Sequence, residues 1–376
     1  MRVVFPREVH SDENRICLFP VSAKKLVDMG WEVIIEQGLG ENCKFKDSEY
    51  EQVGVKVKTK TDLYNDAQVV CRIRKPSDEQ IKELPENVIH LSYLDPFNEK
   101  QLMDQLNQKN ITAISLEMIP RTTLAQKMDF LSSQASLAGY AAVTIAAERL
   151  DKVFPMMTTP AGTISPSRVF IIGAGVAGLQ AIATAKRMGA RVEAFDTRAV
   201  VEEQVQSLVA KFVKVDLGET GQTKDGYAKA LTEDQLKKQQ EVMAKHCALA
   251  DVVITTAQVF GRKAPLIVNK QMVADMKPGS LLVDLAVETG GNVEGSKPGQ
   301  EVDVNGVTII GVNNLPGKVA VHASQMLSAN MTNLLEEIWD KENKKLNLDF
   351  ENEIIKGCVI LQGGKIIHEK IMQVHS

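Results

Sequence analysis

The segment from Arg168 to Ala183 constrains the fold of this chain more than any other part. It holds a short apolar run, then Gly173, Gly175 and Gly178 in GxGxxG spacing, then an alanine-rich helical pattern. Eighteen residues after the third glycine, the next apolar run ends at Asp196. A GxGxxG motif that joins a strand to a helix and is followed by such an acid predicts a dinucleotide-binding βαβ unit.

Each glycine has a geometric reason in such a unit. Gly173 permits the tight turn, Gly175 lets the backbone approach a pyrophosphate, and Gly178 lets the helix pack close to the sheet. The pyrophosphate then lies at a helix N-terminus, where free N–H groups and the helix dipole favour negative charge. The alternative is that three turn glycines and a capping aspartate belong to an α/β protein that binds no nucleotide.

Asp196 also predicts which dinucleotide binds. Its carboxylate is placed to accept hydrogen bonds from the adenosine ribose hydroxyls. A carboxylate there repels a 2′-phosphate, so we expect NAD(H) to bind in preference to NADP(H). Arg198, two residues further on, weakens this preference without reversing it.

Composition excludes several other classes of function. The 376 residues are enough for two domains that each bury a core, and 44% hydrophobic with 24% charged residues is ordinary for a globular protein. A net charge of −4 gives no electrostatic case for binding nucleic acid or an anionic membrane. No apolar run approaches the ~18 residues of a membrane helix, and no signal sequence precedes the first strand. We expect a chain that does not insert into a membrane.

The cysteines lack CxxC spacing and are expected to be buried thiols: Cys17, Cys43, Cys71, Cys247 and Cys358.

Strand-like and helical runs alternate along the chain, which predicts parallel sheets covered on both faces. The expected fold is α/β, with two Rossmann-like doubly wound domains separated by a cleft. We expect one domain at 1–130 plus 325–376 and an NAD(H)-binding domain at 131–324. An apolar helix is predicted at about 132–150, a break at 154–162, a helix at about 324–341 and a hairpin at 353–367. The first domain should hold strands at 3–5, 32–35, 55–57, 68–74, 88–93 and 111–119. The second should hold strands at 169–172, 192–195, 212–215, 252–255, 281–285 and 307–312.

A second group of polar residues lies where the two predicted domains join: Arg121, Gln126, Asp129 and Ser132. Dinucleotide clefts commonly open at such junctions. Arg offers a fixed fork for phosphate or carboxylate, and Gln offers a donor and an acceptor that suit a carboxamide. Ser132 could equally be an ordinary helix N-cap, with Asp129 a nearby turn acid. The polar segment 218–229 is either a lid or a passive insertion.

Several segments together resemble the NAD(H)-binding component, domain I, of proton-translocating NAD(P) transhydrogenase. They are Pro6–Glu8 with Asn14–Arg15, Pro120–Tyr140, Gly173–Ala181, Ala194–Arg198, Asp225–Lys229, Val253–Ala257 and Lys277–Asn292. The resemblance runs nearly from end to end of the chain. It implies two Rossmann-like domains in a homodimer, with NADH bound on the second domain.

The resemblance also implies roles for individual residues. The nucleotide would contact Gly173, Gly175, Val176, Gly178, Asp196, Thr197, Arg198, Gly226, Ala228 and Ala257. Arg121, Gln126, Asp129 and Ser132 would line the nicotinamide end, and Tyr227 would be the tip of a mobile loop. A partner domain that binds NADP(H) would dock at the cleft, and a membrane domain would couple the exchange to proton translocation. The chain would then be cytoplasmic and attached to the inner membrane only through partner subunits, with no metal.

Alanine dehydrogenase is a related family and supplies the alternative function, an NAD-dependent amino acid dehydrogenase of the alanine or saccharopine type. The chain resembles it at Arg15, the position that binds the substrate carboxylate. Arg74, or alternatively Lys75, falls at the catalytic lysine, Tyr93 near the catalytic histidine, and Glu288 at the acid before Gly-Gly. With Arg74 at the lysine position, the acid–base pair that amination needs is missing, because arginine does not titrate near neutral pH; with Lys75 there, the exclusion does not follow.

Direct transfer of a hydride between two nicotinamides needs no such pair. The protein has only to hold the rings close and to keep water out. We therefore expect a Re/Si-specific, proton-translocating NAD(P) transhydrogenase subunit in which Arg121, Gln126, Asp129 and Ser132 act by positioning. A third possibility is a binding protein that takes up NAD without turnover. The six histidines show no metal-ligand spacing.

Overall fold

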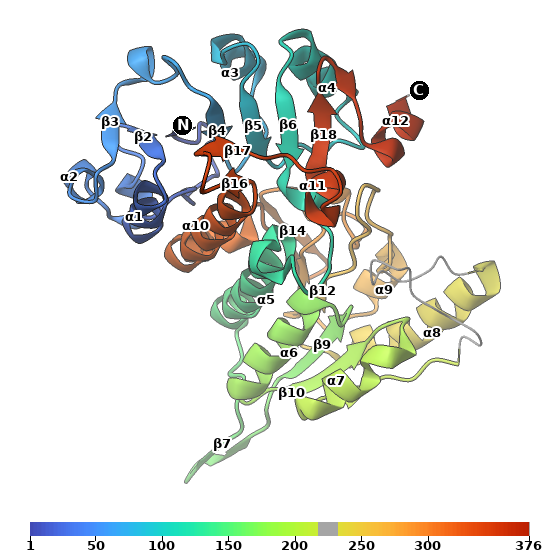
Figure 1. The fold of residues 1–376 in the computed structure, drawn as a ribbon. Helices are drawn as coiled ribbons and strands as arrows, with labels where there is room; N and C mark the ends of the chain where they lie inside the picture. The colour runs from blue at the N-terminus through green and yellow to red at the C-terminus, as the bar shows by residue number, and fades with distance from the viewer. Residues whose placement is uncertain (217–231, 376) are drawn as a thin grey trace. The chain divides into compact units, whose positions relative to one another are not determined.

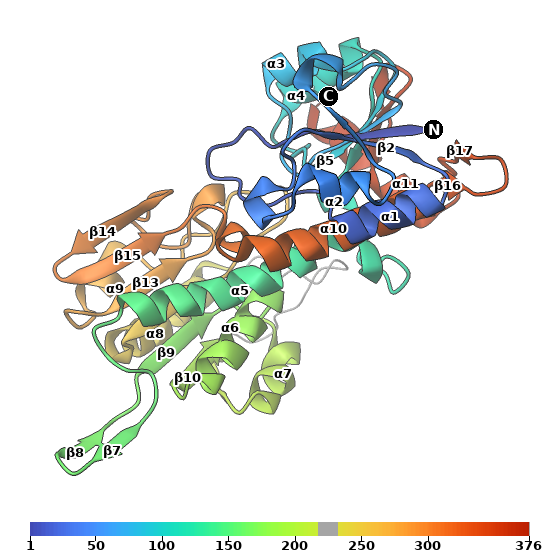
Figure 2. The same cartoon turned by 90° about the vertical axis from the view of Figure 1, so that its left-hand side faces the viewer.

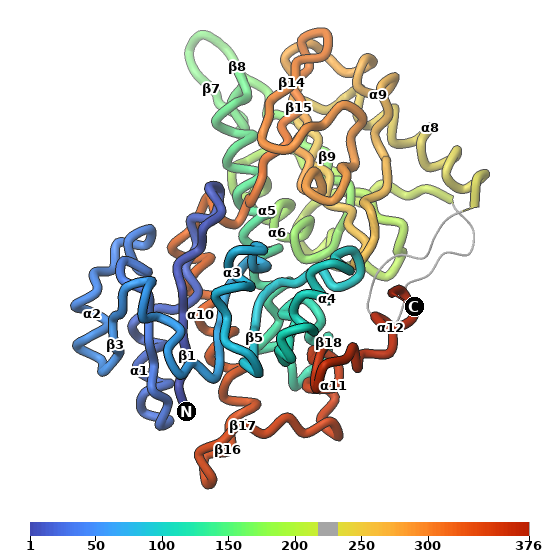
Figure 3. Tube along the Cα trace, turned by 90° about the horizontal axis from the view of Figure 1, so that it is seen from above, coloured from blue at the N-terminus to red at the C-terminus, as the bar shows by residue number. Residues whose placement is uncertain are grey.

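The chain forms two compact α/β units in the computed structural model, which describes residues 1–216 and 232–375 (Figure 1). The first unit comprises Met1–Gln134 and Gly317–Ser376, and the second comprises Ala135–Pro316. The expected boundaries, at 130/131 and 324/325, lie within eight residues of these. The N-terminus and the C-terminal helix therefore belong to the same unit (Figure 3).

The first unit is built on an eight-stranded sheet in the order β19-β18-β6-β5-β4-β1-β2-β3. The strands β1 to β6 are parallel, and the C-terminal strands β18 and β19 add antiparallel to β6. The strand bounds are β1 (Arg2–Phe5), β2 (Glu32–Glu36), β3 (Lys56–Lys58), β4 (Val69–Cys71), β5 (Ile89–Ser92), β6 (Thr112–Ser115), β18 (Val359–Gln362) and β19 (Lys365–Ile366).

Helices cover both faces of this sheet because its strands are apolar on both sides. Residues of α1 and α10 pack with one face, and residues of α3, α4 and α12 pack with the other. Helices α1 and α10 lie side by side (Figure 2). The helix bounds are α1 (Pro20–Asp28), α2 (Asp47–Glu51), α3 (Asp78–Glu83), α4 (Lys100–Gln108), α10 (Ala320–Glu337), α11 (Glu353–Cys358) and α12 (Glu369–His375).

The second unit has a seven-stranded sheet in the order β11-β10-β9-β12-β13-β15-β14, parallel except for the edge strand β14. Its bounds are β9 (Arg168–Ile172), β10 (Arg191–Phe195), β11 (Lys211–Phe212), β12 (Val252–Thr255), β13 (Leu281–Asp284), β14 (Gln300–Val304) and β15 (Val307–Gly311). Helices α5 (Phe130–Arg149), α6 (Val176–Arg187) and α7 (Glu202–Ser207) pack with one face. Helices α8 (Glu233–Leu249) and α9 (Lys270–Ala274) pack with the other.

The strand order reverses between β9 and β12, because β10 and β11 follow β9 in one direction and β13 and β15 follow β12 in the other. Ligands of doubly wound sheets bind beyond the carboxyl ends of the strands at such a switch point. The predicted glycine motif follows β9 directly, so the fold puts it at this position.

The helix α5 differs from expectation, because it is long and apolar enough to cross a membrane by length and composition, with a mean hydropathy of 1.2. It is the only such helix in the described part of the chain. Its residues Ala142, Val143 and Ala146 are fully or almost fully buried in the core of the second unit. Core helices of globular proteins can be equally long and apolar, and 39% of the most apolar stretch of α5 is buried.

The structure also corrects three local predictions. The expected hairpin at 353–367 starts only at β18, because residues 353–358 form the helix α11. The expected break at 154–162 contains a hairpin, β7 (Met157–Thr159) and β8 (Gly162–Ile164), which extends away from the rest of the second unit (Figure 2). The edge strand β14 and the small pair β16 (Trp339–Asp340) and β17 (Lys345–Leu346) were not predicted. All five cysteines are free and buried, as predicted.

Candidate active site

The turn after β9 can be built only from glycine at two of its positions. Gly173 has a φ of +100°, and a Cβ there would lie 2.4 Å from Oγ1 of Thr256. Gly178 lies in the first turn of α6, and its Cβ would lie 1.9 Å from the carbonyl oxygen of Gly173. Helix α6 therefore begins in direct contact with the turn, and a Cβ atom at either glycine would prevent this contact.

Gly175 is different, because an added Cβ would meet nothing closer than a guanidinium nitrogen of Arg198, at 3.9 Å. Gly175 is the N-cap of α6, and no side chain caps the helix there. The first N–H groups of a helix need partners from outside the helix. An open, uncapped N-terminus of this kind suits a pyrophosphate.

The carboxylate of Asp196, which follows β10, is held by four donors. Oδ1 accepts from the backbone N–H of Arg198 at 2.8 Å and from its Nε at 2.9 Å. Oδ2 accepts from the backbone N–H of Ala174 at 2.8 Å and from Nη2 of Arg198 at 2.7 Å. The contact with Ala174 ties the acid to the glycine turn. The hydrogen bonds with Asp196 raise the pKa of Arg198 despite partial burial.

Ala257, predicted to contact nucleotide, lies on the loop after β12 and is fixed by an asparagine that the sequence pattern did not single out. The backbone N–H of Ala257 donates to Oδ1 of Asn292 at 3.0 Å, and Nδ2 of Asn292 donates to the Ala257 carbonyl at 2.8 Å. Asn292 is in turn held by the fully buried Asp284, whose Oδ2 accepts from the Asn292 N–H at 3.0 Å. Two features of the sequence could have indicated this support: Asp284 ends an apolar strand, and Asn292 follows Gly-Gly.

Gly139 was also missed as a packing residue. It lies on α5, and a Cβ there would come within 2.1 Å of the carbonyl oxygen of Ala177 in α6. The two helices therefore approach closely just after the glycine turn. This contact fixes the start of α6, which no side chain caps.

In the first unit, the polar loop before α5 is anchored by its apolar residues and presents its polar ones. Ala125 and Met128 are fully buried, whereas Arg121 and Gln126 are exposed. The loop is also held from α10: Nδ2 of Asn330 and Nδ2 of Asn333 each donate to the carbonyl of Lys127 at 2.9 Å. Gln126 is thus displayed on a rigid 3-10 turn, Gln126–Met128.

The other two residues of this loop, Asp129 and Ser132, contact one another. The sequence suggested Ser132 as the helix N-cap and Asp129 as a nearby turn acid, and the structure reverses these roles. Asp129 precedes the first residue of α5 and accepts from the backbone N–H of Ser132 at 2.8 Å. It also accepts from the Ser132 hydroxyl at 2.6 Å. Asp129 therefore caps the helix, and Ser132 supports that cap. Tyr227, Gly226 and Ala228 lie outside the described residues.

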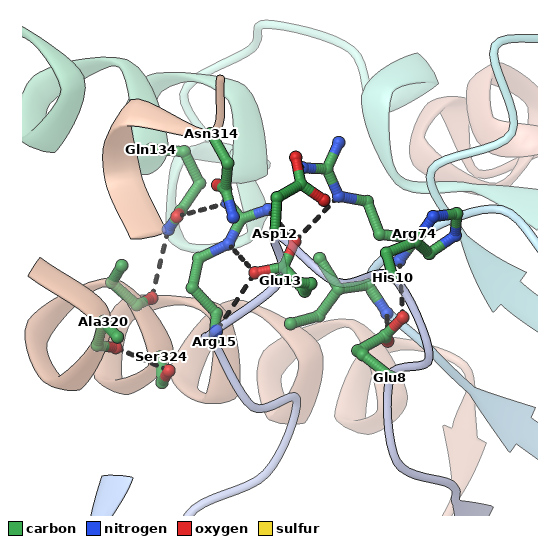
Figure 4. A network of polar contacts seen from close by, with 12 residues as sticks. Glu8, His10, Asp12, Glu13, Arg15, Arg74, Gln134, Asn314, Ala320 and Ser324 are labelled. Atoms are coloured by element: carbon green, nitrogen blue, oxygen red, sulfur yellow. Dashed lines mark hydrogen bonds and ion pairs between the residues drawn. The ribbon is translucent and has the colours of Figure 1, made fainter. Parts of the chain in front are cut away.

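A buried ion-pair network occupies the loop after β1 in the same unit (Figure 4). Glu13, whose side chain is fully buried, accepts from Nη2 of Arg15 at 2.6 Å and from Nε of Arg74 at 2.8 Å. Nη1 of Arg15 donates to Oε1 of Gln134 at 2.9 Å. Burial acts to raise the pKa of Glu13, but hydrogen bonds and charges from Arg15 and Arg74 lower it to about 2.

The charged residues at the positions compared with alanine dehydrogenase are each held by a contact within their own unit. Burial raises the pKa of Tyr93, and Arg74 is engaged by Glu13. Lys75, the alternative counterpart, pairs with Glu99. Glu288 accepts a hydrogen bond from the backbone N–H of Asn314 at 3.1 Å. Among residues 1–216 and 232–375, no group of three or more His, Cys, Asp or Glu side chains could hold a metal ion.

Comparisons with known proteins cover both units. The alanine dehydrogenase/PNT N-terminal domain model matches residues 4–138, and the C-terminal domain model matches residues 142–369. The first of the parts that make up NAD(P) transhydrogenase subunit alpha in Rhodospirillum rubrum is 40% identical, over 98% of each chain. The crystal structure of transhydrogenase from Sinorhizobium meliloti has a TM-score of 0.86 at 37% identity and covers 98% of this chain and 100% of that one. Alanine dehydrogenase of Halomonas elongata is more distant, at 28% identity over 87% of this chain and 85% of that one. These matches confirm the predicted resemblance and the two Rossmann-like domains.

Proposed function

Because the chain belongs to the alanine dehydrogenase/PNT family and binds NAD(H), we propose that it is the NAD(H)-binding subunit of a proton-translocating, Re/Si-specific NAD(P) transhydrogenase. The observation that carries the proposal is the pairing of an uncapped, glycine-lined helix start with the carboxylate of Asp196. It acts with a partner domain that binds NADP(H) and with a membrane domain that couples the exchange to proton translocation.

The residues of the second unit fit the dinucleotide that the family implies. The N–H groups at the start of α6, after Gly175, hold the pyrophosphate. Asp196 accepts from the adenosine ribose hydroxyls, flanked by Thr197 and Arg198. Ala257, fixed by Asn292, forms the wall beyond β12. Bound NADH supplies the hydride that passes to NADP⁺ on the partner domain.

The loop of the first unit acts by positioning. Gln126 and Arg121 are exposed on an anchored turn and can hold the amide of the nicotinamide end without moving their backbone. Asp129 and Ser132 keep the start of α5 fixed beneath them. Tyr227 belongs to the segment that closes over the nucleotide. No acid–base residue is required, because no proton is exchanged when a hydride moves between two nicotinamides.

Assembly is a further element of the proposal. The β7–β8 hairpin exposes Met156, Met157 and Ile164, which are 64%, 43% and 49% exposed. An isolated two-stranded hairpin is marginally stable in water, and exposed apolar side chains on it favour a protein contact. We propose that it packs against a second copy of this chain in a homodimer. The dimer then lies in the cytoplasm and joins the inner membrane only through its partner subunits.

Reconstitution tests the activity. The chain is mixed with an NADP(H)-binding transhydrogenase domain, and reduction of NADP⁺ by NADH is followed with Gln126→Ala and Tyr227→Phe variants. We expect at least a tenfold loss of rate for Gln126→Ala, with no loss for Thr123→Ala, an exposed neutral polar residue on the same loop. Near-wild-type rates in both Gln126→Ala and Tyr227→Phe would remove the proposed roles. Oxidation of NADH by pyruvate and ammonium without a partner would favour the dehydrogenase instead.

A further inference from the structure

The guanidinium group of Arg198 occupies the acceptor positions that the proposed function assigns to the ribose. An ionised carboxylate offers about four acceptor sites on its two oxygens. Asp196 receives four hydrogen bonds, two at each oxygen, at 2.7–2.9 Å. Its side chain is 6% exposed and that of Arg198 is 15% exposed. The carboxylate is therefore fully occupied by the chain's own donors.

The four donors are not equally free to leave. Two are backbone N–H groups, of Ala174 in the glycine turn and of Arg198 itself, and the fold fixes both. The other two are Nε and Nη2 of one guanidinium at the end of a flexible side chain. Only the guanidinium can withdraw without changing the backbone, so any hydroxyl that binds Asp196 must displace it.

We infer that Arg198 is a specificity-determining latch, which competes with the ribose of NADH for Asp196 and, once displaced, pairs with the 2′-phosphate of NADPH. This inference rests on the proposed function, because it needs Asp196 to be the ribose acceptor. The guanidinium lies beside the glycine turn, with Nη2 3.9 Å from the Cβ position of Gly175. Guanidinium forks match phosphate well.

The latch affects the binding of the two nucleotides unequally. It weakens NADH binding, because part of the binding free energy is used to break the Arg198–Asp196 contact. For NADPH this cost is offset, because the released cation gains the 2′-phosphate as a new partner. Selectivity for NADH is therefore lower than an aspartate alone would give, and removing the guanidinium should raise it.

The test is nucleotide binding to the full chain by calorimetry, with Arg198→Met and Arg198→Lys. We expect Arg198→Met to bind NADH about fivefold more tightly, which is ~1 kcal/mol, and NADPH no more tightly than the wild type. Lysine can satisfy fewer of the acceptors, so Arg198→Lys should lie between the two. Adenosine, which carries the ribose hydroxyls without phosphate, should also bind Arg198→Met more tightly.

Control variants separate the possible causes. Arg191→Met removes the same charge from the opposite end of β10, where the side chain is exposed, and should leave NADH affinity unchanged. If Arg198 acted only by attracting phosphate, Arg198→Met would bind NADH more weakly than the wild type. Binding of NADH and adenosine to Arg198→Met that equals the wild type or is weaker would overturn the inference. Asp196→Asn tests the proposed site itself. If Asp196→Asn binds NADH normally, the site assignment fails; if it loses NADH while Arg198→Met is unchanged, only the latch fails.

Discussion

Gly175 and Gly178 lie three residues apart in one motif, yet the structure predicts different consequences when each is replaced by alanine. In Gly178→Ala, the new Cβ starts 1.9 Å from the carbonyl oxygen of Gly173, and an ordinary contact needs 3.4 Å or more. The obstacle is backbone, which cannot rotate away, so α6 must move by about 1.5 Å. In Gly175→Ala, the new Cβ has no neighbour closer than 3.9 Å.

The magnitudes follow from these contacts. Overpacking costs ~1–3 kcal/mol, and we take about 3 because backbone must move. Alanine in a helix regains about 1 kcal/mol over glycine, which leaves a net loss of about 2 kcal/mol in Gly178→Ala. For a domain of this size, that lowers Tm by about 4–8 °C. Gly175→Ala loses only the better N-cap, about 0.5 kcal/mol, or about 1–2 °C.

For nucleotide affinity we expect the reverse order, with the larger loss in Gly175→Ala. The methyl group of Gly175→Ala projects toward the uncapped N-terminus of α6, so we expect at least a tenfold loss of NADH affinity in a protein of nearly normal Tm. Scanning calorimetry without nucleotide and a fluorescence titration with NADH measure both quantities. An unchanged Tm for Gly178→Ala, or unchanged NADH affinity for Gly175→Ala, would refute the reasoning from close packing.

Three further outcomes follow from the structure. Lys109 donates to the carbonyls of Ile81, Lys82 and Leu84 at the end of α3, so Lys109→Met should lower Tm by a few degrees. Lys82→Met, which removes only an exposed side chain, should not, and equal effects would argue against the cap. Burial and the charge of Arg72 lower the pKa of His90 from 6.5 to about 3, so its stabilising contribution is present above pH 6.5 and is lost as the pH falls toward 3. His90→Gln should flatten this part of the stability profile measured by urea unfolding, and an identical profile would show that His90 is not responsible. Finally, Met157→Asp with Ile164→Asp should convert dimers to monomers in sedimentation velocity, and a dimer that persists would place the interface elsewhere.

The strand–turn–helix unit that holds the glycine motif was readable in the sequence because its determinants are local. Gly173, Gly178 and Asp196 are fixed by the order strand, turn, helix, strand, and that order has a strong periodic signal. The short apolar strands of both sheets were found for the same reason. Strand ends were less accurate: the expected strand 111–119 stops at Ser115, where a 3-10 turn begins.

Other features depend on contacts that no local pattern encodes. Asp284 and Asn292 support the loop at Ala257 through side chains that come from separate strands and turns. Asp129 rather than Ser132 caps α5 because the helix starts at Phe130 and not at about residue 132, as expected. The β7–β8 hairpin was missed because its residues are exposed. Strand β14 was missed because it lies at the sheet edge and its two apolar residues, Val302 and Val304, are only partly buried.

The occupation of Asp196 by Arg198 is of the same kind. Their spacing suggested a weakened preference for NAD(H), but only the distances show that the guanidinium contacts both oxygens of Asp196, which we propose as the ribose acceptors. An arginine that we propose to oppose nucleotide binding looks the same in the sequence as an arginine that would assist it.

Direct hydride transfer is the central claim, and an isotope experiment tests it most directly. NADH carrying deuterium at the transferred C4 position is incubated in ordinary water with this chain, an NADP(H)-binding partner domain and NADP⁺, and the NADPH is analysed by mass spectrometry. We predict one deuterium retained in each NADPH formed. Deuterium lost to water, or NADPH formed without label, would contradict transfer between two nicotinamides held face to face.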